Sequence, residues 1–236
     1  VAYDEGSDTV VMATTDAGLH FVDVSDPMMP TLRQTIPNES RQLTIHQGVV
    51  YAGGDGAITR YLARTGERLE ATTIAGTVND ISASPSHLYV LTNTELQVFE
   101  QTQAGPALRG SVNVVGFAPP SIGLRRLFVG DSIAYVGHFQ GYTTVDISDP
   151  AAPAVVGTPP ETQAAVHDMK ANGSGLLLPV TSFAGLSTLA LSLYDGTDPA
   201  DVTRFQTSIE SPGETRAVAL ASGIAYVADG SAGLQV

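Results

Sequence analysis

The feature that most constrains the fold of this chain is an internal repeat. Two segments nearly coincide, GLHFVDVSDPMMP at 18–30 and GYTTVDISDPAAP at 141–153, and weaker copies fill the gaps between and after them. The copies begin at residues 18, 56, 95, 141, 190 and 233, an average spacing of about 43 residues. Such a period is typical of architectures in which each repeat buries its apolar faces against its neighbours.

Each repeat consists of four short apolar segments. The copies are preceded by stretches rich in Val, Tyr and Leu that end in turn residues, such as VVYAGG, AYVGHF and AYVADG. One shorter apolar segment lies before each of these, and another follows each SDP-like turn. No segment shows the period of an amphipathic helix. Four strands in about 40–45 residues are typical of a propeller blade.

We therefore predict an all-β fold, a β-propeller of four-stranded antiparallel blades with five complete blades and a partial sixth. The predicted blades of this single domain cover approximately residues 1–37, 41–75, 78–113, 123–158, 164–210 and 213–236.

The SDP-containing copies resemble a known repeat family. VDVSDP at 22–27, VDISDP at 145–150 and the final AYVADGSAGLQV are similar to the LVIVD repeat of bacterial and archaeal surface propellers. Copies two and three depart from the pattern, since Tyr61 and Glu100 stand where Asp23 and Asp146 stand in the closer copies. The resemblance implies a propeller located outside the cell, at the cell surface or in the periplasm.

The first and last copies are shorter than the others. The first blade begins just after the position where other blades carry RQ, ND, RR, HD or RA, and the sixth lacks a last strand. An open propeller would expose strand edges and apolar blade faces. We therefore expect the chain to be a fragment, incomplete at both ends, and the remainder of a longer polypeptide to complete the propeller.

Composition excludes several classes of function. The absence of Cys excludes a disulfide framework, a thiolate zinc site and a Cys nucleophile. A formal charge of −13 argues against nucleic acid as a partner, because its phosphates would be repelled. The uncharged stretch from Ala171 to Tyr194 is long enough to span a membrane, but Pro179, glycines and several Ser and Thr interrupt it. We predict two buried strands there and no membrane span.

The starts of the first strands are the most informative polar positions, because the first strand of a propeller blade lines the central channel. Two interpretations remain open: a site that binds an anionic or carboxylate ligand, or a wet lining in which Arg residues pair with Asp80 or Asp168. The alternation of side chains along a strand argues against His167 and Asp168 facing one another as a base and its orienting group. The residues that the repeats align here are Arg41, Asn79, Arg125, His167 and Arg216 at one level, and Gln42, Asp80, Arg126, Asp168 and Ala217 at the next.

Carboxylates also gather in turns, where they suggest either calcium binding or capping of backbone N–H groups. Asp before Pro typically starts a turn and caps it, so we expect a structural role for most of them. The best calcium candidates are Asp4 and Asp8 in DEGSD, and Asp195, Asp198 and Asp201 in DGTDPAD. We expect no other cofactor.

Two functions remain open. The first is a non-enzymatic interaction or scaffold domain that binds a protein or surface partner. The alternative is a propeller enzyme, hydrolase-like or lactonase-like, or a binder of anions or carboxylates, that uses the Arg and His residues at the channel mouth. No G-x-S-x-G, H-E-x-x-H or P-loop motif occurs in the sequence, and we assign no catalytic residue.

Overall fold

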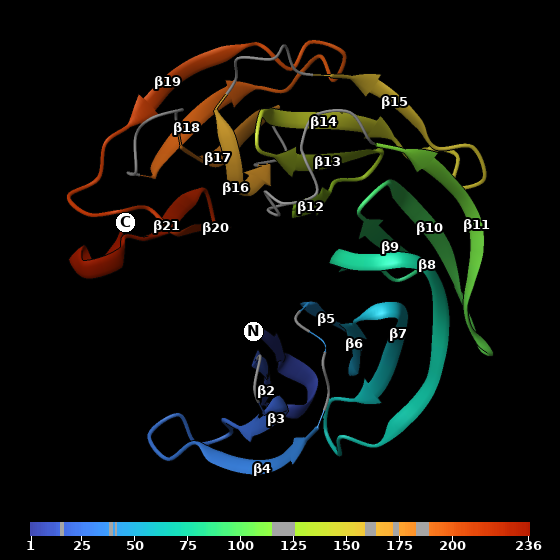
Figure 1. Cartoon of the computed structure of the whole chain (residues 1–236). Helices are drawn as coiled ribbons and strands as arrows, with labels where there is room; N and C mark the ends of the chain where they lie inside the picture. The colour runs from blue at the N-terminus through green and yellow to red at the C-terminus, as the bar shows by residue number, and fades with distance from the viewer. Residues whose placement is uncertain are drawn as a thin grey trace. The chain divides into compact units, whose positions relative to one another are not determined.

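Strands dominate the structure, a computed structural model that describes residues 1–14, 17–37, 40, 42–114, 126–158, 164–171, 175–182 and 189–236 (Figure 1). The chain divides into two compact units, Val1–Asn113 and Val114–Val236. Within the described residues, helical turns are limited to two short 3-10 segments, Glu5–Ser7 and Gly230–Ala232.

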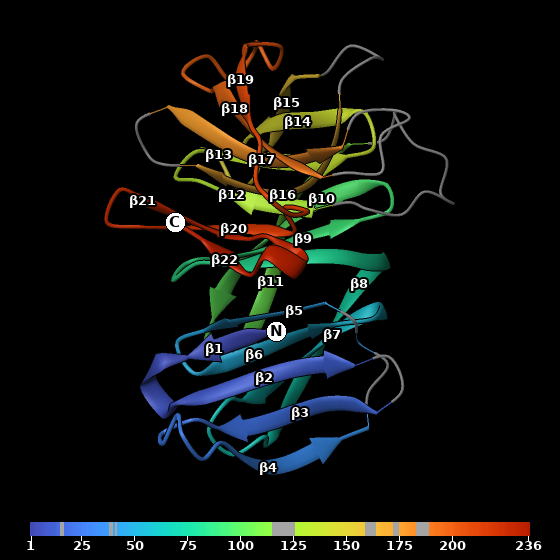
Figure 2. The same ribbon diagram turned by 90° about the vertical axis from the view of Figure 1, so that its left-hand side faces the viewer.

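The first unit contains two antiparallel sheets. The first sheet has the order β1 (Ala2–Asp4), β2 (Thr9–Thr14), β3 (Gly18–Asp23) and β4 (Thr31–Ile36), which lie side by side in Figure 2. The second sheet has seven strands: β5 (Gln42–His46), β6 (Val49–Gly53), β7 (Asp55–Leu62), β8 (Arg68–Ala83), β9 (His87–Thr92), β10 (Glu95–Thr102) and β11 (Gly105–Asn113).

One long strand joins two predicted blades in the first unit. The sequence predicts separate strands at ERLEATTI and NDISA, but β8 runs through both without a break. Its first half pairs with β7, up to Thr77 against Asp55, and its second half pairs with β9, from Val78 against Thr92. Gly76, with a φ of 104°, lies where the strand passes from one partner to the other. The seven-stranded sheet is therefore two blades that share one strand.

The second unit contains three antiparallel sheets. The first has the order β12 (Arg126–Val129), β13 (Ile133–His138), β14 (Gly141–Asp146) and β15 (Ala154–Gly157). The second has the order β16 (Ala165–Ala171), β17 (Leu176–Ser182), β18 (Ala190–Asp195) and β19 (Phe205–Ile209). The last has the three strands β20 (Ala217–Ala221), β21 (Ile224–Ala228) and β22 (Leu234–Gln235). This three-stranded sheet is the predicted partial sixth blade.

The structure confirms the predicted all-β fold of four-stranded antiparallel blades. The uncharged stretch at 171–194 contains β17 and all of β18 except its last residue, Asp195. No helix among the described residues is long and apolar enough to cross a membrane. The assignment of the whole chain to one domain stays a prediction. The segment GFAPPSIG at 116–123, between the third and fourth predicted blades, and Phe183 lie outside the described residues.

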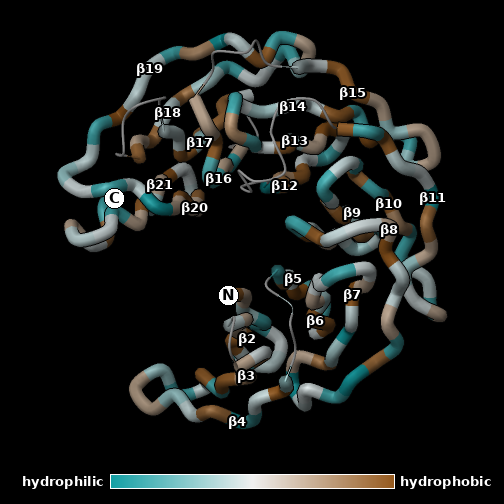
Figure 3. Tube along the Cα trace, viewed as in Figure 1, coloured by the Kyte–Doolittle hydropathy of each residue, from teal (hydrophilic) through white to brown (hydrophobic). Residues whose placement is uncertain are grey.

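The core of each unit lies between consecutive sheets. In the first unit Phe21 and Leu19 of β3 pack with Val50 of β6 and Tyr61 of β7. In the second unit, one cluster joins Tyr142 of β14 to residues of β16, β17 and β18, and another joins Leu191 of β18 to β20 and β21. Brown hydrophobic and teal hydrophilic segments alternate along the tubes in Figure 3. Within each unit, successive sheets thus bury apolar side chains against one another, as the repeat predicts.

A β-bulge recurs in the outermost strand of the blades. In four blades the third and fourth strands shift register by one residue at the same place. A bulge disrupts the regular edge that would otherwise be open to another strand. The extra residues are Arg33, Arg109, Val156 and Gln206.

A glycine in β15 tests this packing between sheets. A Cβ on Gly157 would lie 2.5 Å from Thr144 Oγ1 and 2.9 Å from Val202 Cγ1, and still closer to the carbonyl oxygen of Pro199. We expect Gly157→Ala to lower the free energy of unfolding by about 1–3 kcal/mol, because a packed site cannot take the methyl group. Gly54→Ala is the control, since its Cβ would meet only Ser40 Oγ at 3.7 Å. Urea unfolding measures both, and equal stabilities would contradict the packing described.

Candidate functional site

The residues that the sequence places at the strand starts are divided between the two units. Asn79 and Asp80 lie in β8 of the first unit, whereas Arg126, His167, Asp168 and Arg216 lie in the second. Arg41 and Arg125 lie outside the described residues. The channel-mouth site therefore stays a prediction as a whole, and the structure describes each half separately.

In the first unit, Asn79 is the extra residue of a bulge. Val78 pairs with Thr92 and Asp80 pairs with Leu91, so Asn79 has no direct partner across the strand. Its side-chain amide instead donates to Asn93 Oδ1 at 2.9 Å, just beyond the end of β9. The carboxylate of Asp80 accepts from the N–H of Ile81 at 2.9 Å. Both polar side chains thus support the irregular backbone of the bulge.

His167 occupies the corresponding bulge in the second unit. Val166 pairs with Thr181 and Asp168 with Val180, which leaves His167 as the extra residue. Its Nε2 lies 2.8 Å from the hydroxyl of Ser182, at the end of β17. The simple alternation of side chains expected for His167 and Asp168 does not hold, because a bulge places two residues opposite one.

Asp168 fastens one blade to the next. Its Oδ2 accepts from the N–H of Val218 in β20 at 3.1 Å, and its Oδ1 accepts from the N–H of Met169 at 2.9 Å. Lys170 Nζ lies 3.6 Å from the same Oδ1 and 5.0 Å from the ring centre of Phe128. Both oxygens of the carboxylate therefore bond to the backbone, and the bond to Val218 joins two sheets.

The electrostatic surroundings of His167 are positive on balance. Burial lowers the pKa of His167 below its usual 6.5, the Arg126 guanidinium lowers it further, and the Glu214 carboxylate opposes both. Glu214 accepts an ion-paired hydrogen bond from Arg216 at 2.6 Å. We call Arg126, His167, Ser182, Glu214 and Arg216 the strand-start cluster; all five lie in the second unit.

The carboxylates of the turns cap the backbone. Each accepts from the N–H two residues later, at 2.9–3.1 Å, and Ser25, Thr197 and Thr203 add a hydroxyl. The Ser25 hydroxyl and amide, followed by Arg33, lower the pKa of Asp23 to about 2. The capping residues are Asp23, Asp26, Asp146, Asp149, Asp195, Asp198 and Asp201.

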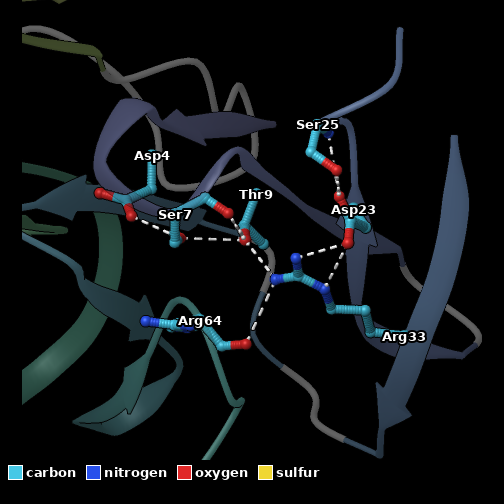
Figure 4. A network of polar contacts seen from close by, with 7 residues as sticks. All are labelled: Asp4, Ser7, Thr9, Asp23, Ser25, Arg33 and Arg64. Atoms are coloured by element: carbon cyan, nitrogen blue, oxygen red, sulfur yellow. Dashed lines mark hydrogen bonds and ion pairs between the residues drawn. The ribbon is translucent and has the colours of Figure 1, made fainter. Parts of the chain in front are cut away.

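Arginines in or directly before the fourth strands pair with acidic residues at one repeat position. Arg33 donates to Asp23 at 2.6 Å and to Thr9 at 2.8 Å, and reaches the carbonyl of Arg64 at 3.3 Å (Figure 4). Arg204 pairs with Asp195 at 3.0 Å. Arg109 pairs with Glu100, the residue that replaces Asp in copy three. An acidic residue at this repeat position therefore forms an ion pair with an arginine even in copy three, which departs from the family pattern.

The five calcium candidates have contacts of their own. Asp4, which is buried, accepts from the Ser7 hydroxyl at 2.6 Å, and Asp8 accepts from the Tyr3 hydroxyl at 2.9 Å. Asp195, Asp198 and Asp201 are the turn caps described above. Among the residues that the structure describes, no three His, Asp or Glu side chains are grouped to hold a metal ion.

Three residues that contribute to the site or to the framework are not identified by the sequence patterns. Ser182 could have been found by alignment, since it is the last residue of the second strand of its blade and Asn93 directly follows the second strand of its own. Glu214 lies in an irregular segment that no repeat pattern marks. Asp229 is fully buried and holds the segment before β20 through the Ser211 hydroxyl and the N–H of Gly213.

The fold and these repeated contacts define a β-propeller built from sequence repeats. Three segments match the model of the LVIVD repeat, residues 10–36, 126–158 and 212–236. They fall on the copies with the clearest VDVSDP, VDISDP and AYVADG sequences. The chain therefore carries LVIVD repeats within a β-propeller fold.

Solved structures share this fold at low sequence identity. A candidate 6-phosphogluconolactonase from Bacteroides uniformis is similar with a TM-score of 0.71 and 12% identity, over 96% of this chain and 76% of that one. The computationally designed Ika8 protein is similar with a TM-score of 0.67 and 13% identity, over 99% of this chain and 69% of that one. At these identities the likeness shows the fold alone. No curated protein matches the sequence.

The contact between Asp168 and Val218 leads to a prediction about stability. We expect Asp168→Ala to lower the free energy of unfolding by about 1–3 kcal/mol, because two backbone N–H groups lose their acceptor. Asp168→Asn keeps one acceptor oxygen and should lose less. Urea unfolding at neutral pH compares the two variants, and a wild-type midpoint for Asp168→Ala would show that the bond between sheets contributes nothing.

The lowered pKa of His167 leads to a prediction about pH. Because the folded state binds the proton less readily than the unfolded state, the stabilising contribution is complete above pH 6.5 and is lost as pH falls below it. We expect the His167→Gln variant to lose less stability than the wild type between neutral and mildly acidic pH. Urea unfolding as a function of pH measures this difference, and parallel pH profiles would contradict it.

Proposed function

We propose that this chain is a non-enzymatic LVIVD-repeat propeller that acts outside the cell, at its surface or in the periplasm, as an interaction or scaffold domain with a protein partner. The observation that carries this proposal is the use of the repeat carboxylates. Seven Asp side chains cap turns, and Asp168 joins two sheets. These carboxylates therefore stabilise the blades and the contact between them. The same repeat positions provide similar contacts in several blades.

The turn between β3 and β4 supports a role in interaction. Met28 and Met29 at its tip are 87% and 71% exposed, and Leu32 nearby is 60% exposed. The tip is fixed in shape, because Asp26 accepts from the N–H of Met28 through its side chain and from the N–H of Met29 through its carbonyl. The corresponding turns carry Ala151 and Ala152 in the fourth blade, and Ala200 and Asp201 in the fifth. An exposed, fixed apolar tip is suited to contact with a partner.

Photo-methionine cross-linking tests the proposal on the surface of the producing cells. The chain has four methionines, and Met169 is fully buried, so it serves as an internal negative control. We expect cross-links to one defined surface protein at Met28 or Met29, and their loss in a Met28→Asn, Met29→Asn double variant with an unchanged circular dichroism spectrum. Absence of cross-links, or cross-links that survive the double substitution, would count against a partner at this tip.

A second candidate function is ligand binding at the strand starts. The observation that favours it is the strand-start cluster, where His167 bonds to Ser182 close to the charges of Arg126 and Glu214. A hydrolase-like or lactonase-like enzyme would need such a ligand site first.

A further inference from the structure

We propose that the strand-start cluster binds an oxyanion group, a phosphate or a carboxylate, held by the guanidinium groups of Arg126 and Arg216 and the imidazole of His167. This inference rests on the second candidate function above and is independent of the scaffold role. All the residues that it uses lie in Val114–Val236.

The three basic side chains lie at the starts of the first strands of three successive sheets. Arg126 is the first residue of β12, His167 lies at the bulge of β16, and Arg216 directly precedes β20. The bond from Val218 N–H to Asp168 fixes β20 against β16 at this level. Because His167 is the extra residue of its bulge, its side chain is not fixed by the regular pairing of the two strands.

The hydrogen bond between His167 and Ser182 bears on which ring nitrogen can donate to a ligand. When the Ser182 hydroxyl donates to Nε2, the ring proton resides on Nδ1, which becomes a donor. Burial and Arg126 keep the free imidazole neutral at neutral pH, since both lower its pKa. A bound anion would favour the protonated ring, because it would offset the charge of Arg126.

The charges that face the cluster favour an anion. Arg126 and Arg216 contribute two of the 11 basic residues of a chain whose formal charge is −13. Asp168 is already bonded to two backbone amides and lies beside Lys170. The opposing effect of Glu214 on His167 is smaller than that of Arg126.

The ion pair between Glu214 and Arg216 shows that a guanidinium of the cluster binds a carboxylate. Its carboxylate accepts from Arg216 at 2.6 Å, in the short geometry of a charge-assisted hydrogen bond. The Arg216 side chain is 61% exposed, so an external oxyanion can reach it. Such an anion would compete with Glu214 for the guanidinium. Removal of the Glu214 charge should therefore strengthen binding, whereas removal of either arginine should weaken it.

Histidine NMR provides the test, with sodium phosphate, sodium acetate and sodium chloride compared at matched ionic strength. We expect phosphate or acetate to raise the pKa of His167 relative to chloride, with the other four histidines as internal references. His167→Gln assigns the resonance. A response to phosphate alone identifies a phosphate group, and a response to acetate alone identifies a carboxylate; either supports the proposal. Equal titration of His167 in all three salts overturns it.

Matched variants locate the site. We expect Arg126→Gln to weaken anion binding about tenfold or more, and Glu214→Gln to strengthen it severalfold. Arg204→Gln is the control, because it removes the same charge from the ion pair with Asp195, near the edge of the His167-containing sheet that lies opposite β16. Arg216→Gln, at an exposed side chain, replaces Arg126→Gln if that variant does not fold. Unchanged affinity in the arginine cluster variants would overturn the assignment, whatever the cross-linking at Met28 and Met29 shows.

Discussion

Burial of two apolar sheet faces is the interaction on which the rest of this structure depends. A small antiparallel sheet cannot bury both faces by itself, so each blade requires a neighbour. The buried clusters accordingly join residues of successive sheets, as Phe21 with Val50 in the first unit and Tyr142 with Met169 in the second. Gly157 shows how closely such faces approach, since no space remains there for a methyl group. Sequence repetition is the consequence, because every blade must present similar faces.

The same constraint explains how much of the fold the sequence predicts. A strand pattern repeated at nearly constant spacing predicts blade number, strand order and the partial last sheet, all of which depend on which residues are buried. The continuity of β8 is different, because it depends on whether the chain turns or runs on near Gly76, and both choices bury the same side chains. The bulges at Arg33 and His167 are also hidden, since one extra residue leaves the composition of a strand almost unchanged.

The candidate site was also only partly predictable, because the burial pattern of a repeat does not specify contacts between sheets or outside strands. Alignment gives Asn79 and His167 the same repeat position, and both are bulge residues that bond at or just beyond the end of the next strand. It cannot reveal that Asp168 reaches the backbone of Val218, since that bond depends on the spacing between sheets. Nor does it reveal Glu214, which lies outside any strand and nevertheless pairs with Arg216. Repeats predict what blades share, whereas a binding site depends on where they differ.

The contrast between contacts that blades share and positions at which they differ separates structural residues from candidate functional residues in this chain. A side chain whose contact recurs in several blades, such as the turn caps of Asp23, Asp146 and Asp195, contributes to a unit that every blade needs. At the strand starts, a bulge residue bonds to a residue at or just beyond the end of the next strand, and blade five uses an imidazole there where blade three uses an amide. An amide would meet the structural requirement equally well. Histidine adds a titratable ring beside Arg126, and the proposed anion would favour the protonated form of that ring.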